Sequence, residues 1–270
     1  MFGNAKDSSV KIDDTEMYYV SFGNGKKTFV VLPGLSDGLA TVKGKAFILS
    51  RAYKAYFNDY TVYMFSRKNK MPEGYSIQDM ADDLAKALKS LGIERTCLMG
   101  VSQGGMIAQS FTIRHPEMVE KLVLTVTAPC VNDMIRANVS SWIELAERGD
   151  HKSLMIDTAE KGYSEAYLKK YRKYYPILGF VGKQKSYDRF LKNARAILNF
   201  DASEEVGNIS CPVLVIGGSI DKTVGPEGSR ILHEKIKGSE LYMYEGISHA
   251  PFEEAAADFY ARVLSFLTTA

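Results

Sequence analysis

The sequence predicts an α/β protein with a mostly parallel, doubly wound sheet and an inserted helical cap, and three observations lead to this class. Short apolar segments alternate with helical segments along most of the chain. Several apolar segments are hydrophobic at successive positions, which is typical of parallel strands that are covered on both faces. The alternation stops between residues 130 and 205, where helical patterns replace strands.

The expected strands are short segments rich in Val, Ile, Tyr and Phe, which favour extended structure. They occupy residues 28–32, 61–65, 96–101, 122–126, 213–216 and 241–244. Two earlier pieces with strand character, around Ile12 and at residues 17–22, are expected to form an antiparallel hairpin at one edge of the sheet.

The expected helices lie between these strands, at residues 44–57, 77–91, 103–114, 227–236 and 252–268. The second has Ser76 at its start with Asp79 three residues later, and Gly92 just past its end, which are signals that begin and end a helix. The order of elements predicts an α/β core of residues 1–129 and 206–270, interrupted by a helical cap of residues 130–205.

Composition narrows the class of protein further. The 270 residues are 46% apolar and 24% charged, as in an ordinary globular protein, and the formal net charge of +2 disfavours a nucleic-acid partner. The polar N-terminus lacks a signal-peptide core and no apolar run approaches the ~18 residues that span a bilayer, so a cytoplasmic protein without a membrane partner is expected. The cysteines are few, odd in number and widely spaced, which predicts neither disulfides nor a metal site: Cys97, Cys130 and Cys211.

A serine stands on the expected turn between the strand at residues 96–101 and the helix that follows. Residues 100–104 read Gly-Val-Ser-Gln-Gly and fit G-x-S-x-G, in which the glycines remove Cβ atoms that would clash in a tight strand-to-helix turn. The helix N-terminus beneath Ser102 would also stabilise negative charge. The plain alternative is a glycine-rich turn, but the context favours a nucleophile.

A serine nucleophile needs a base and an acid that orients it, and two later strands end in loops that carry them. The strand at residues 213–216 leads to Asp221, and the strand at 241–244 leads to His249. Since the carboxyl ends of parallel strands meet at one edge, we expect both beside Ser102. Asp133 is the alternative acid. The remaining histidines do not follow a strand end: His115, His151 and His233.

Negative charge in a transition state needs two donors that already point at the developing oxyanion. The backbone N–H of Gln103, directly after the candidate nucleophile, is one. The loop at residues 33–38 follows the first core strand and offers the other, for which Leu35 N–H is the candidate. An ordinary glycine-rich turn is the alternative interpretation of this loop.

Together these residues resemble the α/β-hydrolase fold superfamily, specifically its cap-bearing esterases, lactonases and C–C hydrolases. The most specific stretch is residues 100–109 with His115-Pro-Glu and Lys121-Leu-Val-Leu, which is similar to the elbow helix and next strand of enol-lactonases and haloperoxidase-like esterases. One departure is Pro33-Gly34, where the family usually has His-Gly. Serine at the elbow, in place of aspartate, argues against dehalogenase and epoxide hydrolase chemistry.

The resemblance implies a nucleophilic Ser102, with His249 as general base and acid, Asp221 as its orienting acid, and Leu35 and Gln103 as oxyanion amides. The leading hypothesis is therefore a serine hydrolase that cleaves small carboxylic esters, thioesters or lactones through an acyl-enzyme, with no metal or organic cofactor. A C–C bond hydrolase or peptidase of the same fold is the second reading, and a catalytically weak ligand receptor is the third. The physiological substrate and the oligomeric state stay open.

The expected cap is rich in both aromatic and basic residues. Between Lys161 and Arg195 there are ten Lys or Arg against two acids, and Tyr163, Tyr167 and Tyr171 recur every four residues along one helical face. The simpler expectation is that the rings pack the cap on the core while the cations are solvated. The sharper one is that the rings roof the site and that the basic field favours acyl groups bearing a carboxylate.

Overall fold

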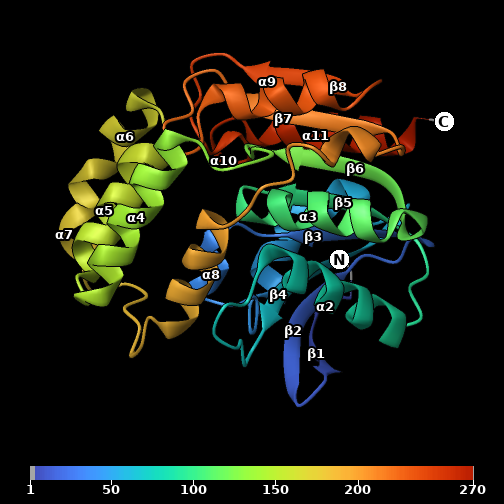
Figure 1. Ribbon diagram of the computed structural model, residues 1–270, viewed down its shortest axis with the longest axis horizontal. Coiled ribbons are helices and arrows are strands. Elements are labelled where there is room, and N and C mark those ends of the chain that lie inside the picture. Colours follow the sequence, from blue (N-terminus) through green and yellow to red (C-terminus); the bar gives the residue numbers. More distant parts are fainter. Residues whose placement is uncertain (1–3, 270) are drawn as a thin grey trace.

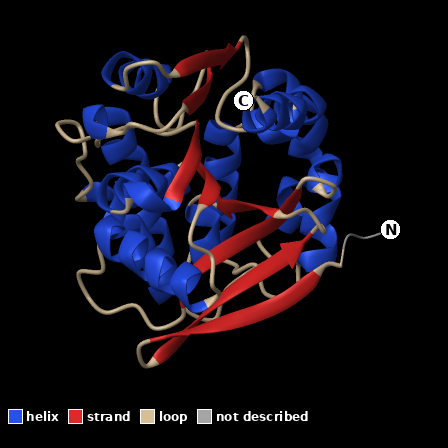
Figure 2. Cartoon of the chain, turned by 90° about the vertical axis from the view of Figure 1, so that its right-hand side faces the viewer, coloured by secondary structure: helices blue, strands red, loops and turns tan. Residues whose placement is uncertain are grey.

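The computed structural model describes residues 4–269, in which eight strands form one sheet with helices on both faces (Figures 1 and 2). The strand order is β1-β2-β4-β3-β5-β6-β7-β8. In chain order the strands are β1 Lys6–Ile12, β2 Thr15–Phe22, β3 Lys27–Leu32, β4 Tyr60–Lys68, β5 Thr96–Val101, β6 Val119–Thr125, β7 Val213–Gly218 and β8 Glu240–Tyr244.

The sheet is parallel except at one edge. β1 pairs with β2 and β2 with β4 in antiparallel register, while the pairs from β4 and β3 through to β7 and β8 are parallel. Every residue of β7 is buried, whereas exposed and buried positions mix along the edge strand β1. The expected α/β class, the mostly parallel sheet and the edge hairpin are confirmed.

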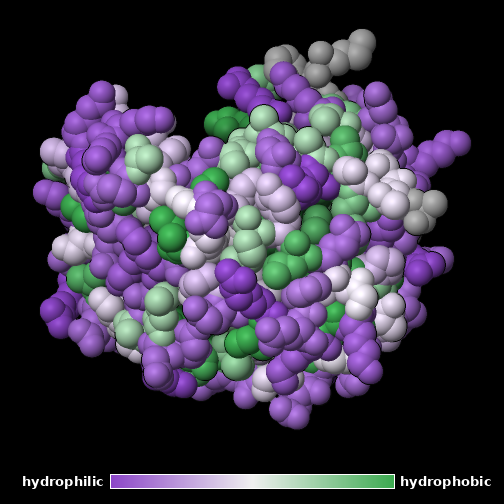
Figure 3. All heavy atoms as spheres, turned by 90° about the horizontal axis from the view of Figure 1, so that it is seen from above, coloured by the Kyte–Doolittle hydropathy of each residue, from purple (hydrophilic) through white to green (hydrophobic). Residues whose placement is uncertain are grey.

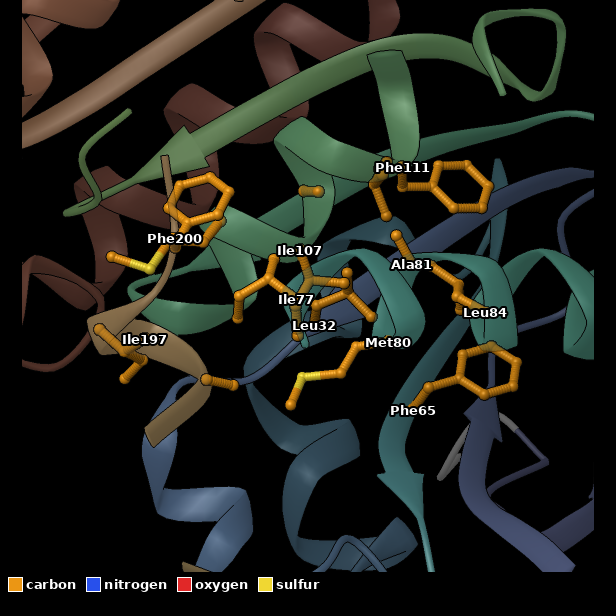
Figure 4. Packing of buried hydrophobic residues seen from close by; sticks show 14 of the residues in the cluster. Leu32, Phe65, Ile77, Met80, Ala81, Leu84, Ile107, Phe111, Ile197 and Phe200 are labelled. Carbon is orange, nitrogen blue, oxygen red and sulfur yellow. The ribbon is translucent and has the colours of Figure 1, made fainter. Parts of the chain in front are cut away.

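Two hydrophobic clusters lie on opposite faces of the sheet. On one face pack α2 (Ile77–Ser90), α3 (Gln103–Arg114) and α9 (Pro226–Lys235). On the other pack α1 (Ala46–Ser50), the 3₁₀ turn η2 (Arg51–Tyr56) and α11 (Ala256–Thr268). Figure 4 shows the first cluster gathered around α2 and α3. Elsewhere on the surface, the face in Figure 3 carries small hydrophobic patches among hydrophilic residues.

Two expected helices are divided in the structure. The segment at residues 44–57 becomes α1 followed by η2, and the segment at 252–268 becomes α10 (Pro251–Glu254) followed by α11. In a 3₁₀ turn, residues three apart lie on the same side. Tyr53 and Tyr56 are therefore both directed into the core, where Tyr56 Oη donates to Tyr260 O at 2.7 Å.

Helices occupy the chain between β6 and β7, and we call residues 130–205 the cap segment. Its helices are α4 (Asp133–Glu147), α5 (His151–Gly162), α6 (Glu165–Tyr171), the 3₁₀ turn η4 (Arg172–Tyr174), α7 (Tyr175–Leu178) and α8 (Asp188–Leu198). In Figure 1, α4 to α7 form the yellow-green group at the left, with α8 between them and the sheet.

The two ends of the cap segment lie together. Cys130 and Asp201 form an isolated antiparallel bridge, and Ala202 N donates to Pro129 O at 2.8 Å. The chain therefore leaves the sheet and returns to it at neighbouring points. Within residues 4–269, no helix combines the length and apolarity that crossing a bilayer requires.

Candidate active site

Ser102 occupies a strained turn between β5 and α3. Its φ of 54° and ψ of −120° lie outside the regions that side-chain-bearing residues usually adopt. The surroundings hold it there, because Ser102 N donates to Thr125 O at 2.9 Å and Thr127 Oγ1 donates to Ser102 O at 2.8 Å. A Cβ on Gly100 would lie only 2.2 Å from Gly104 O, so this turn requires glycine. Strain that the surroundings enforce is characteristic of functional positions.

Asp221 and His249 meet across two neighbouring loops. Asp221 Oδ2 lies 2.8 Å from His249 Nδ1, and Asp221 Oδ1 accepts hydrogen bonds from Thr223 N at 2.8 Å and Val224 N at 3.0 Å. Burial on its own raises the pKa of the Asp221 carboxyl, but His249 and the two amides outweigh it, and the net pKa lies below the ordinary value. The carboxylate is therefore built to stay ionised against the imidazole.

The loop that carries His249 is held by the end of α5. His249 N donates to Gly162 O at 2.9 Å, and Ser248 Oγ donates to Lys161 O at 2.8 Å. Ser248 Oγ also accepts a hydrogen bond from Lys222 N at 3.1 Å, which ties the loop of Asp221 to the same point. The end of α5 thus fixes the imidazole relative to the sheet.

Ser102 and His249 line one cavity of about 530 Å³ that lies between the sheet edge and the cap segment. Ser102 Oγ makes no hydrogen bond to any residue in the described range, so the serine and the imidazole share the cavity without being joined in this geometry. Catalytic contacts of this kind often form only once substrate is bound.

The structure separates the candidate acids and histidines. Asp133 is exposed in the first turn of α4, and Asp221 is the acid bonded to His249. The other histidines have partners elsewhere, namely His115 with Asp82, His151 with the carbonyl of Val181, and His233 with Ser239. Of the four histidines, His249 alone lines the cavity.

The two candidate oxyanion amides belong to the first residues of two helices beside Ser102. Leu35 is the first residue of the 3₁₀ helix η1 (Leu35–Gly38), and Gln103 is the first residue of α3. The first N–H of a helix has no acceptor within that helix. Gly34 brings the first loop close, since a Cβ there would lie 3.3 Å from Ser102 Cβ. Leu35 thus lines the same cavity as Ser102, and Gln103 follows Ser102 directly in the chain.

Tyrosines of the cap segment form a wall of the cavity. Ring centroids are 4.7 Å apart for Tyr163 and Tyr167 and 4.5 Å apart for Tyr167 and Tyr171, and all three line the cavity. Burial raises the pKa of Tyr167 to about 12, so the phenol stays neutral. No Lys or Arg of the described residues lines the cavity, whereas Glu253 does, so the lining does not support the expected preference for a carboxylate.

Sequence reasoning missed two sets of residues near the site. The first set is Lys161 and Gly162, whose carbonyls accept hydrogen bonds from the loop of His249. No local sequence pattern predicts this contact. The other is Arg67, a buried cation at the end of β4. Its position just after an apolar strand, at the same sheet edge as the other site residues, was an available signal. Among residues 4–269, no group of three or more His, Cys, Asp or Glu is arranged to hold a metal ion.

The sheet and the strand-to-helix turn at Ser102 define an α/β hydrolase. The chain belongs to the alpha/beta hydrolase fold family, whose sequence model matches residues 50–256. The resemblance predicted from the sequence is thereby confirmed.

The curated relatives share about a quarter of their aligned residues with this chain. The chain is 26% identical over 182 residues to a protein of Serratia proteamaculans provisionally named carbamate hydrolase RutD, covering 64% of this chain and 66% of that protein. It is 26% identical over 199 residues to the AB hydrolase superfamily protein YisY of Bacillus subtilis, covering 70% and 73%. The chain thus spans about two thirds of the length of the first of these relatives.

Solved structures show the same fold at low identity. MGS-M2, an α/β-hydrolase enzyme from a deep-sea metagenome library, superposes with a TM-score of 0.85 at 20% identity over 97% of this chain and 98% of that one. The enol-lactonase from Burkholderia xenovorans LB400 gives 0.82 at 21% identity over 97% and 100%.

Proposed function

We propose that the protein is a serine hydrolase that cleaves small carboxylic esters, thioesters or lactones through an acyl-enzyme on Ser102. The observation that carries the proposal is the bond of 2.8 Å between His249 Nδ1 and Asp221 Oδ2 at the cavity that Ser102 also lines. An ionised acid on Nδ1 leaves Nε2 of the imidazole free to accept a proton.

In the proposed reaction, Nε2 of His249 takes the proton of Ser102 as the hydroxyl oxygen attacks the substrate carbonyl. The N–H groups of Leu35 and Gln103 donate to the oxyanion that forms. As the tetrahedral intermediate collapses, the imidazolium gives its proton to the leaving alkoxide or thiolate. Water then attacks the acyl-enzyme, assisted by the same imidazole, which releases the carboxylic acid and restores Ser102.

The cavity lining supports a substrate with an uncharged acyl group. It consists mainly of apolar and phenolic side chains, and Trp142, Met155 and Phe190 contribute to it beside the tyrosines. A carboxylate in the acyl chain would meet Glu253 and no described cation there. Since the relatives named RutD are described as carbamate hydrolases, a carbamate ester belongs in the substrate panel.

Labelling with a fluorophosphonate, followed by peptide mapping, tests the nucleophile. The wild-type chain should be modified at Ser102, and Ser102→Ala should lose labelling and at least ~10⁴-fold in turnover of a p-nitrophenyl ester. Ser90→Ala is the matched control, because Ser90 lies at the far end of α2 and bonds only to the carbonyl of Lys86.

The alternatives give different results. A folded wild-type chain that is not labelled at Ser102 would contradict the proposal and favour the ligand receptor. Labelling with no turnover of esters, thioesters or lactones, but with cleavage of a diketone or a peptide, would favour a C–C hydrolase or a peptidase.

A further inference from the structure

Three charged side chains meet beneath the loop that carries Leu35. Asp37 and Arg67 are 2% and 3% exposed, and Arg189 reaches them from α8. Asp37 Oδ2 accepts hydrogen bonds from Arg67 N at 3.0 Å and from Arg189 Nη2 at 2.6 Å. Nη1 of Arg67 lies 3.9 Å from the same oxygen. Two guanidinium groups therefore lie beside one carboxylate, which leaves an excess of positive charge under the loop.

A single nitrogen of Arg67 joins the two segments that carry the candidate oxyanion amides. Arg67 Nη2 donates to Pro33 O at 2.7 Å and to Gln103 Oε1 at 3.0 Å. Pro33 precedes the turn at Gly34 that presents Leu35 N–H, and Gln103 provides the other amide. Since proline has neither a backbone N–H nor a polar side chain, its carbonyl is the one group through which Arg67 can hydrogen-bond to it.

The cap segment completes the same network. Gln103 Nε2 donates to Asn193 O of α8 at 2.7 Å, so the glutamine amide is fixed at both of its ends. Arg189 Nε also donates to Asp37 O at 3.1 Å. The oxyanion loop is therefore held directly by Arg67 of β4 and Arg189 of α8, and it is linked to Gln103 of α3 through Arg67.

The network is not arranged for stability alone. Three buried atoms of Asp37 and Arg67 have no hydrogen-bond partner, namely Asp37 Oδ1, Arg67 Nε and Arg67 Nη1. Buried polar atoms without partners cost free energy, so stability alone would not favour this arrangement. Burial lowers the pKa of Arg67 to about 10, which still leaves the guanidinium charged at neutral pH.

We infer that Arg67 is a positioning residue for the oxyanion amides, holding Leu35 N–H and Gln103 N–H in register through Pro33 and the Gln103 side chain. The inference rests on the proposed function. The buried positive charge of Arg67 also stabilises the negative charge that develops on the carbonyl oxygen. The contribution belongs to the transition state, so it should be seen in kcat and not in substrate binding.

The test compares Arg67→Met and Arg67→Lys with the wild-type chain on a p-nitrophenyl ester. Arg67→Met should lower kcat by ~10²-fold, the loss typical of one oxyanion donor, with KM within about twofold. A trifluoromethyl ketone, which forms an oxyanion with Ser102, should bind more weakly by the same factor by which kcat/KM falls. Arg67→Lys should retain part of the rate, because an ammonium keeps the charge but lacks the planar guanidinium.

The matched control is Arg114→Met, because Arg114 is an exposed arginine paired with Asp82 at the end of α3. It should leave kcat, KM and ketone binding unchanged. If Arg67→Met does not fold, Gln103→Met removes the Oε1 acceptor while keeping the backbone amide, and should lower kcat by ~10-fold. The double variant should lose no more than Arg67→Met alone, because both changes break one connection.

Arg67→Met with kcat within threefold of wild type would overturn the inference. So would a loss of kcat without weaker ketone binding, which indicates a structural role only. Failure of the proposed function is a separate result, since it would appear as an unlabelled Ser102 in the wild-type chain. If Ser102 is labelled but the Arg67 variants keep the wild-type kcat, only the positioning role of Arg67 is contradicted.

Discussion

The cap segment is hydrogen-bonded to the loops of the site at two places, the end of α5 and α8, which we call its flanks. The part between them, which we call the projecting part, lines the cavity but makes no hydrogen bond to those loops among the described residues. On one flank, the end of α5 holds the loop of His249 through Gly162 O, and Glu254 of α10 accepts a hydrogen bond from Ser164 N at 2.9 Å. On the other flank, Arg189 of α8 bonds to the loop of Leu35. The flanks thus contact the two loops on which the proposed chemistry depends.

The projecting part consists of residues 165–182, and its polar contacts lie inside the cap segment. Arg172 donates to Glu160 Oε1 at 2.8 Å and to Glu160 Oε2 at 2.7 Å. Several large apolar side chains here face solvent, among them Phe180, which is 83% exposed. From this difference in contacts we infer a division of roles, in which the flanks position the reacting groups and the projecting part shapes the cavity.

This division makes a prediction about rates. Changes at the sheet edge and at the flanks should alter kcat, because they move the reacting groups. Changes in the projecting part should alter KM, because they remove contacts that bind substrate and transition state equally.

The largest effect is expected for Asp221→Asn. An asparagine at this position favours the imidazole tautomer with the proton on Nε2, so kcat should fall by ~10⁴-fold while ester binding changes little. Steady-state kinetics on a p-nitrophenyl ester measures it. Asp133→Asn is the matched control on α4, and a larger loss for that variant than for Asp221→Asn would show that the orienting acid is Asp133.

The expected position of Asp221, like that of Ser102 and His249, followed from the sequence because parallel strands end at one edge of the sheet. The strands themselves were predictable from their apolar runs. The network of Arg67 could not be predicted from the sequence, because it joins four separate elements through side-chain geometry. Likewise, the contact between Gly162 and His249 spans a long stretch of chain and uses backbone atoms, whose positions no residue type encodes.

Lowering the pH should destabilise the projecting part, because its Arg172 pairs with the Glu160 carboxylate of α5. Hydrogen bonds from Arg172 lead the causes that lower the pKa of Glu160 to about 2 from its ordinary 4.5. A lowered carboxyl pKa stabilises the folded state above the ordinary value, and this stabilisation is lost as the pH falls from about 4.5 to about 2.

Thermal unfolding of the wild-type chain and of Glu160→Gln between pH 6 and pH 2 measures this contribution. Glu160→Gln should have the lower Tm at pH 6, and the two curves should converge toward pH 2. Glu144→Gln is the control, since Glu144 of α4 and its partner Arg148, just past the end of that helix, are both well exposed. A Tm difference for Glu160→Gln that stays constant over this range would rule out the ion pair as its cause.

The smallest effect is expected for Tyr171→Ala. The Tyr171 ring lies 4.5 Å from that of Tyr167, lines the cavity and is 44% exposed, so its removal takes away contact area without touching the loops of Leu35 or His249. Loss of one such aromatic contact is worth about 1 kcal/mol, which corresponds to ~5-fold in KM for an ester with a long acyl chain.

The value of kcat should stay within twofold, because no reacting group moves. Phe180→Ala is the control from the same part of the chain, since Phe180 is more exposed and is not part of the cavity wall; it should leave both constants unchanged. Should Tyr171→Ala lower kcat as strongly as it raises KM, the projecting part would be positioning reacting groups too, and the division between flank and middle would not hold.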